Sequence, residues 1–259
     1  MRRKRKRKLK KQFKILFITI PTAVVVIGLI IFAFRLQNVK VSFDLNQFTE
    51  SEVKAYMDAK KIDNTLIFWF KNKIGKSQKM DLFEEYSVKM DSPFGVTIIA
   101  YEKKLIGYIE NNKAYCYFDD TGRILKITSE KMKSIPKVTG LGYGKLVLYD
   151  KIHAENKEAL SSILQVSNAI EEYGFNVKQI NISDKLETTL YIKNIEVQLG
   201  KESGMDAKLR DLNDLYKNVI KYSGVLNMKR LDKDGKYTLK KKDNSKKTKD
   251  KTKNKAKTQ

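Results

Sequence analysis

The chain has 259 residues, enough for one or two compact domains that each bury a core. Its 53 Lys and Arg against 30 Asp and Glu give a net charge of +23, which usually indicates a polyanionic partner. The basic charge is concentrated at the ends, however, because residues 1–14 hold ten Lys or Arg and no acid, and residues 236–259 hold eleven Lys and two Asp. Residues 15–235 therefore carry only +4. One Cys and one His exclude a disulfide framework and a multi-Cys or His-based zinc site.

An uncharged apolar run occupies residues 15–34, directly after the basic N-terminus. As a helix this run would be about 30 Å long, the thickness of the bilayer hydrocarbon. Its end, Phe32-Ala33-Phe34, lacks the small-residue pattern of a signal-peptide cleavage site, so we expect a retained transmembrane helix. Because positive charge before a first span stays inside the cell, the sequence predicts a single-pass cell-membrane protein with a cytoplasmic N-terminus and an extracellular C-terminus.

The segment 38–102 has the pattern strand, helix, helix, strand, strand. Thr49 with Glu52 forms a capping box, which predicts the start of the first helix, and Asn64 or Thr65 can cap the second. Alternating apolar residues predict the strands. In chain order we expect a strand at 38–43, a helix after Thr49, a helix containing 66–70, and strands around 86–90 and 96–100 joined by a turn at 91–95.

The aromatic run Phe68-Trp69-Phe70 in the second helix has two interpretations. It can be buried in the core of this domain. It can also reach into the outer headgroup layer close to the end of the span, because tryptophan favours that interface.

Residues 103–239 predict a second, mixed β domain with two helices, and Asp119-Asp120-Thr121-Gly122 predicts a tight turn within it. Residues 240–259 have no apolar side chain to bury beyond one Ala and are expected to be disordered. The fold class is therefore α+β. The expected strands are 105–109, 113–118, 124–127, 145–149, 177–182, 188–192, 196–199, 225–231 and 236–239, and the expected helices are 154–173 and 205–221.

Several short motifs of this chain resemble the DivIB/FtsQ family of bacterial cell-division proteins. One is Pro93 followed by alternating apolar residues and then Glu102-Lys103. Others are Tyr117 to Leu125, with its Asp119 and Gly122, and Ile135-Pro136-Lys137-Val138-Thr139-Gly140. Asn227 stands where many members have Asp.

The resemblance implies a single-span protein with an external POTRA domain over 38–102 and a β domain over 103–239. It further implies a non-enzymatic scaffold of the division septum that binds the external domains of DivIC and FtsL and influences the septal peptidoglycan synthase through them. An alternative is a membrane-anchored cell-wall-binding or wall-processing protein. The Lys-rich tail is expected to make loose contact with anionic wall polymers. Duplex DNA is not expected as a partner, because the predicted topology places the tail outside the cell, and a C-terminus inside the cell would favour a membrane-anchored nucleic-acid binder instead.

No catalytic group, cofactor or metal is expected. His153 is interpreted as a surface residue and Cys116 as a small residue in a sheet. The pairs Asp119-Asp120 and Glu84-Glu85 lack calcium-loop spacing, and Gly140 to Gly144 lacks the helix that a nucleotide loop requires.

The strand pair that closes the second domain predicts where a partner docks. One of its strands must be a sheet edge, and an edge offers unpaired backbone groups to a second chain. The predicted partner-binding residues are Leu231, Tyr237, Thr238 and Leu239. Against this, a closing strand normally buries one face, so the three apolar residues can also all pack inward.

Overall fold

The computed structural model describes residues 5–201 and 203–242, with side chains in the first helix described from Ile18 onward. The chain divides into two compact units, 1–103 and 104–259. Helices and sheets occur in both units, so the α+β class is confirmed. Among the described residues, no helix combines the length and hydropathy that a membrane span needs. The first three residues of the predicted span, the N-terminal tail and residues 243–259 of the C-terminal tail lie outside the described side chains.

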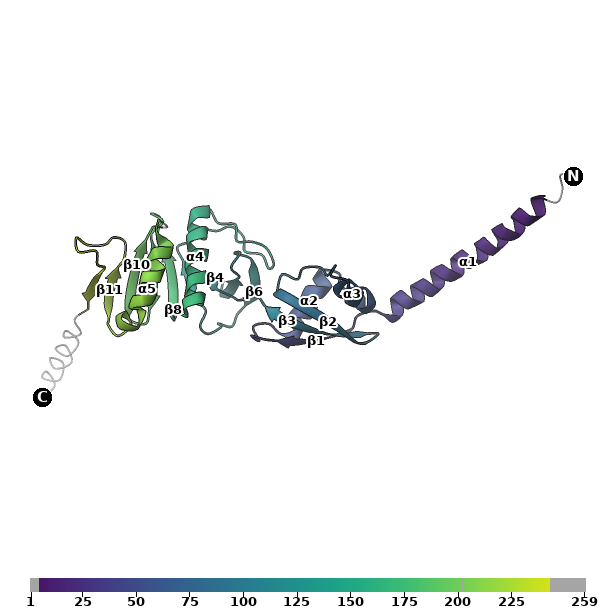
Figure 1. The fold of residues 1–259 in the computed structure, drawn as a ribbon, viewed down its shortest axis with the longest axis horizontal. Coiled ribbons are helices and arrows are strands. Elements are labelled where there is room, and N and C mark those ends of the chain that lie inside the picture. Colours follow the sequence, from purple (N-terminus) through teal and green to yellow (C-terminus); the bar gives the residue numbers. More distant parts are fainter. Residues whose placement is uncertain (1–4, 202, 243–259) are drawn as a thin grey trace. The chain divides into compact units, whose positions relative to one another are not determined.

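The first unit has the predicted order of strand, helix, helix, strand, strand after its long first helix (Figure 1). Its three-stranded sheet has the order β1-β3-β2, with β1 parallel to β3 and β2 antiparallel to it. The capping box of Thr49 and Glu52 is present, and Asn64 caps the next helix. The elements are α1 (Arg5–Ala33), β1 (Asn38–Phe43), α2 (Glu50–Ala59), α3 (Thr65–Lys73), β2 (Phe83–Ser92) and β3 (Gly95–Glu102).

A buried carboxylate organises one end of this sheet. Glu102, at the end of β3, is only 3 % exposed, and its oxygens accept hydrogen bonds from the backbone N–H groups of Leu45, Gln47 and Phe48 at 2.8–2.9 Å. Its own N–H donates to Asp44 Oδ1 at 2.9 Å. Buried carboxylates are tolerated only when they are hydrogen-bonded in this way. Glu102 therefore fixes the loop between β1 and α2.

The second unit is a nine-stranded sheet with two helices. The strand order is β12-β11-β10-β9-β8-β7-β4-β5-β6. An antiparallel block of β4, β5 and β6 and a mixed block of β8 to β12, in which β10 and β11 pair in parallel, lie on either side of the three-residue β7. β7 pairs in parallel with β8 over three positions and with β4 at one position. The elements are β4 (Gly107–Asn111), β5 (Ala114–Phe118), β6 (Ile124–Thr128), β7 (Lys137–Thr139), α4 (Lys157–Tyr173), β8 (Val177–Ile182), β9 (Thr188–Ile192), β10 (Ile195–Gly200), α5 (Met205–Val219), β11 (Gly224–Asn227) and β12 (Thr238–Lys241).

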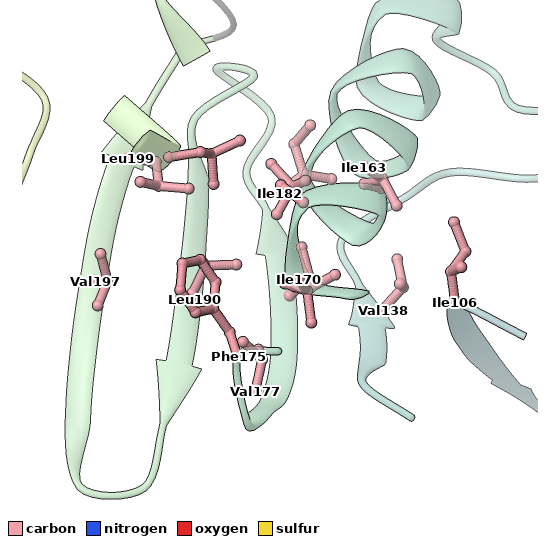
Figure 2. Close-up of a cluster of buried hydrophobic side chains, with 14 of the residues drawn as sticks. Ile106, Val138, Ile163, Ile170, Phe175, Val177, Ile182, Leu190, Val197 and Leu199 are labelled. Carbon is pink, nitrogen blue, oxygen red and sulfur yellow. The ribbon is translucent and has the colours of Figure 1, made fainter. Parts of the chain in front are cut away.

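One continuous core extends beneath both helices of this unit. Figure 2 shows Ile163 and Ile170 of α4 beside Ile182 of β8 and Val138 of β7. The same core continues through Leu190 and reaches α5 and β11. A contiguous set of buried apolar side chains is the main source of stability for such a layer, at about 25 cal/mol per Å² of apolar area.

Gly140 ends the motif that runs from Ile135 to Gly140, and the structure explains why a glycine is required there. It follows β7, has φ +81°, and a Cβ added there would lie 1.8 Å from the carbonyl oxygen of Ile182. A side chain at this position would therefore clash with the backbone of β8 as well as adopt an unfavourable conformation. The Thr-Gly step of the motif lets β7 and β8 pair closely.

Several elements of the second unit differ from the prediction. Residues 145–149 form no strand, because Tyr149 has φ +65° and its N–H donates to the Ile124 carbonyl in a turn that contacts β6. The strand β7 was not predicted, since three residues are too few for a period of two to appear. Helix α4 begins at Lys157, later than expected, and helix α5 ends at Val219, earlier than expected.

Candidate functional site

The site is built on the last strand of the sheet. β12 pairs only with β11 among the described strands, in antiparallel register with Leu239 opposite Leu226, so it forms one edge of the nine-stranded sheet. The expectation that one of the two closing strands is an edge is therefore confirmed. Its four side chains are exposed except for Leu239, which is half-buried.

The register shows which backbone groups of β12 point away from the sheet. Just beyond the strand, the Lys242 N–H donates to the Ser223 carbonyl at 2.8 Å, which marks Lys242 and Ser223 as a hydrogen-bonded pair. Hydrogen-bonded and non-hydrogen-bonded pairs alternate along an antiparallel ladder. The backbone N–H and C=O groups of Lys240 and Thr238 therefore also face β11. The N–H and C=O groups of Leu239 and Lys241 therefore point to the outer side, where the structure describes no strand.

The connection between β11 and β12 is longer than predicted, which corrects the two strand assignments. β11 ends at Asn227 and β12 begins at Thr238, so Leu231 and Tyr237 lie in the connecting loop. Within this loop the Asp232 carboxylate accepts the N–H groups of Asp234 and Lys236 at 2.9 and 2.8 Å and closes a turn. Gly235, with φ +70°, lies in this turn.

A groove of about 610 Å³ runs between this loop and α5. Leu231, 54 % exposed, and the half-buried Tyr237 and Leu239 line one side. One stripe of α5 lines the other side: Asp211, Asp214, Leu215 and Asn218. Tyr222, just beyond the end of the helix, continues this side of the groove. The groove thus combines an apolar floor with two exposed carboxylates.

Polar contacts hold the loop over the helix. The Tyr237 hydroxyl donates to Asp211 Oδ2 at 2.7 Å, and the Lys241 ammonium lies 4.0 Å from the centre of the Tyr222 ring. Burial, together with the hydrogen bond to the Asp211 carboxylate, raises the pKa of Tyr237 to about 12. The phenol therefore stays a hydrogen-bond donor throughout the physiological pH range.

Gly224 allows β11 and β12 to approach each other. Its φ is +151°, and a Cβ there would lie 2.1 Å from the carbonyl oxygen of Lys240. Only glycine fits this contact without moving the edge strand.

The four predicted residues are thus divided by the structure. Leu231, Tyr237 and Leu239 share the groove, whereas Thr238 is exposed outside it. The interpretation in which all three apolar residues pack inward is wrong for Leu231, while Tyr237 and Leu239 do pack partly against the core. The stripe of α5 was missed. Its spacing beside the buried Leu212 and Val219 is the signal that indicates it.

The residues considered above as catalytic or metal-binding groups do not form a common site among the residues that the structure describes. His153 is exposed, and Cys116 is buried in β5, where burial raises the pKa of its thiol and disfavours the nucleophilic thiolate. Asp119 is buried and accepts from Thr121 and Arg123 N–H groups in its turn. In the described part of the chain, no cluster of His, Cys, Asp or Glu has the composition of a metal site.

The comparison with protein families bears on the unit that contains this site. The family model described as FtsQ/DivIB, C-terminal related, matches residues 106–234, which run from the start of β4 into the loop before β12. The chain belongs to the FtsQ/DivIB family. The resemblance inferred from the motifs is thereby confirmed, and the family indicates a role in cell division. No curated protein matches the chain.

Proposed function

We propose that this FtsQ/DivIB-family chain is a membrane-anchored, non-enzymatic scaffold of the bacterial division septum. In this proposal it binds the external domains of small division proteins through the edge strand β12 and thereby regulates septal peptidoglycan synthesis. The observation that carries the proposal is the open outer side of β12, next to an apolar groove and just beyond the family-matched residues 106–234.

The proposed anchor is the apolar run 15–34, with the N-terminus in the cytoplasm and both units outside. It is supported by the absence of charge over that run and by the apolar side chains that α1 exposes from Ile18 to Phe32. Exposed apolar surface of this extent is unfavourable in water and favourable in hydrocarbon. The order β1-α2-α3-β2-β3 supports a POTRA domain over 38–102, and the nine-stranded sheet supports a β domain over 103–239.

The proposed partners are proteins of the DivIC and FtsL type, which would link the chain indirectly to the septal peptidoglycan synthase. An extended segment of such a partner can add to β12 by pairing with the outward backbone groups of Leu239 and Lys241. Backbone pairing supplies affinity, while the groove beside Leu231 can accept a partner side chain and so supplies specificity. We also propose loose contact of the Lys-rich tail with anionic wall polymers.

Binding of the full chain in lipid nanodiscs to purified external domains of DivIC and FtsL tests the docking edge. Lys241→Pro removes an outward N–H, and we expect partner affinity to fall by about tenfold or more, because a buried carbonyl of the partner loses its donor. Lys241→Ala is the matched control, since it keeps the N–H and removes only the ammonium. Equal affinities of the two variants would remove β12 from the interface.

Two measurements separate the scaffold from the alternatives. A cysteine placed at Thr258 should react with an impermeant reagent in intact cells, whereas lack of labelling with a working control would contradict the external topology. The purified chain should release no fragments from peptidoglycan in a zymogram. Release would favour the membrane-anchored wall-processing protein instead.

A further inference from the structure

Helix α3 carries an exposed apolar stripe. Ile67, Phe70 and Ile74 are 47 %, 53 % and 47 % exposed, and their spacing of three and four residues places them on one side of the helix. Phe68, by contrast, is 6 % exposed and packs into the core beside Tyr86. The core interpretation of the aromatic run is therefore confirmed for Phe68, whereas Phe70 is exposed. The stripe itself is left without a described partner within the first unit.

The charge around the stripe is one-sided. Lys71, Lys73, Lys76 and Lys79 lie between residues 64 and 80, and no acidic residue occurs in that interval. The Lys73 ammonium lies 4.9 Å from the centre of the Trp69 ring. An apolar face that includes Phe, with lysines around it, is typical of helices that lie in the surface of an anionic bilayer.

Hydrogen bonds join the start of α3 to the end of α1. The Thr65 N–H donates to the Phe34 carbonyl at 2.8 Å, and Asn64 Nδ2 donates to the Ile31 carbonyl at 3.1 Å. The Leu36 N–H donates to the Asp63 carbonyl at 2.7 Å. Asn64 is also the N-cap of α3, so one buried side chain connects the two helices.

We infer that α3 is an interfacial helix whose stripe of Ile67, Phe70 and Ile74 lies in the outer leaflet of the anionic membrane that α1 enters. The inference rests on the anchoring proposed above, because a bilayer around the last turn of α1 must also be close to the first turn of α3. The lysines around the stripe then meet lipid headgroups while the apolar side chains reach the acyl boundary.

Trp69 provides the test, because it is the single tryptophan of the chain and lies in α3. The full chain is reconstituted in vesicles of phosphatidylcholine and phosphatidylglycerol, with or without acyl chains brominated near the headgroup. We expect Trp69 emission to fall by about twofold with the brominated lipid, since bromine quenches only at short range from an inserted helix. Quenching should be weaker in phosphatidylcholine alone, and quenching of equal size would overturn the role of the lysines.

Two variants locate the contact. Phe70→Ser with Ile74→Ser should abolish most of the quenching, whereas the control Ile99→Ser with Tyr101→Ser, which alters exposed apolar residues of β3, should keep it. Retained quenching in the first variant would overturn the inference. Extraction at alkaline pH tests the anchor separately: a chain that stays in the membrane without quenching of Trp69 refutes only the interfacial helix, and a chain that is released refutes the anchor and the helix together.

Discussion

The two surfaces considered above, α3 in the first unit and β12 in the second, are of different kinds. The first unit leaves side chains uncovered, along α3, where every backbone group of the helix interior is already hydrogen-bonded within the helix. The second unit leaves backbone uncovered, along β12, where the side chains are mostly polar. An apolar helix stripe can enter any apolar phase, because the contact requires no defined pairing of atoms. A strand edge, in contrast, binds a second strand at defined positions.

The difference indicates which surface suits a fluid environment and which suits a protein partner. A bilayer has no register to match, so apolar area and positive charge are sufficient for α3. A protein partner must be distinguished from other chains, and in the proposed function the groove beside β12 offers Leu231, Asp211 and Asp214 for this discrimination. Variants that damage one unit at a time therefore separate the two roles.

The largest effect is expected for Gly140→Ala in the second unit. Its Cβ would overlap the Ile182 carbonyl, so we expect the free energy of unfolding of this unit to fall by about 3 kcal/mol or more. Urea unfolding followed by tyrosine near-UV circular dichroism measures it, while Trp69 fluorescence should report an unchanged first unit. Gly235→Ala is the control, because its φ is also positive but its Cβ meets open space. Similar losses in both variants would rule out the backbone clash.

Glu102→Ala is expected to destabilise the first unit without affecting the second. The change removes the buried acceptor of three backbone N–H groups, so we expect a loss of about 2–3 kcal/mol. The urea midpoint of Trp69 fluorescence should move, while the tyrosine near-UV signal, which comes mostly from the second unit, should change little. Glu110→Ala, which removes a surface ion pair with Lys137, should change stability by less than about 1 kcal/mol. A midpoint that does not move would show that Glu102 is dispensable for the loop.

Leu231→Asp sharpens the comparison at the partner site. The side chain is exposed, so folding should be unchanged, but a third carboxylate would enter a groove that already holds Asp211 and Asp214. We expect partner affinity to fall by about tenfold, or about 1.4 kcal/mol, in calorimetry with the full chain. Leu148→Asp, at another exposed leucine of the same unit, should bind as the wild type does. A loss of the same size there would indicate a general charge effect.

The smallest effect concerns Tyr237 and pH. Because folding raises the pKa of Tyr237 from 10.0 to about 12, its contribution to stability is complete below pH 10 and is lost as pH rises toward 12. Tyr237→Phe should cost about 0.5–1 kcal/mol at pH 8, through loss of the hydrogen bond to Asp211, and the difference from the wild type should narrow above pH 10. Thermal unfolding at several pH values measures this, and a pH-independent difference would contradict it.

Most elements of the first unit could be predicted from the sequence, because the residues that mark their boundaries lie within or next to each element. Thr49 with Glu52, Asn64 and the turn at 91–95 each mark an element boundary within a few residues, and all are confirmed. The second unit was predicted less completely, since its sheet order depends on contacts between distant segments. The strand at 145–149 was wrong because an apolar run does not reveal whether a neighbouring strand is available to pair with it.

The candidate site was predicted in part for the same reason. Alternation around Leu239 and the position of the closing strands near the end of the fold indicated an edge. The groove could not be derived, because it requires the loop to fold back on α5 through the contact of Tyr237 with Asp211, which are 26 positions apart. The outward direction of the backbone N–H and C=O groups of Leu239 and Lys241 likewise depends on the strand register. A register shift of one residue would reverse that direction.

The three-residue strand β7 has a consequence for how the second unit opens. Backbone pairing between the block of β4, β5 and β6 and the rest of the sheet passes through a single paired position, Tyr108 with Lys137. The two blocks are therefore held together at this seam mainly by side chains such as Val138 and Ile163, which belong to the common core. Amide protons beside the seam should exchange with solvent sooner than those of β8 to β10, and pulling on the sheet would separate it there first.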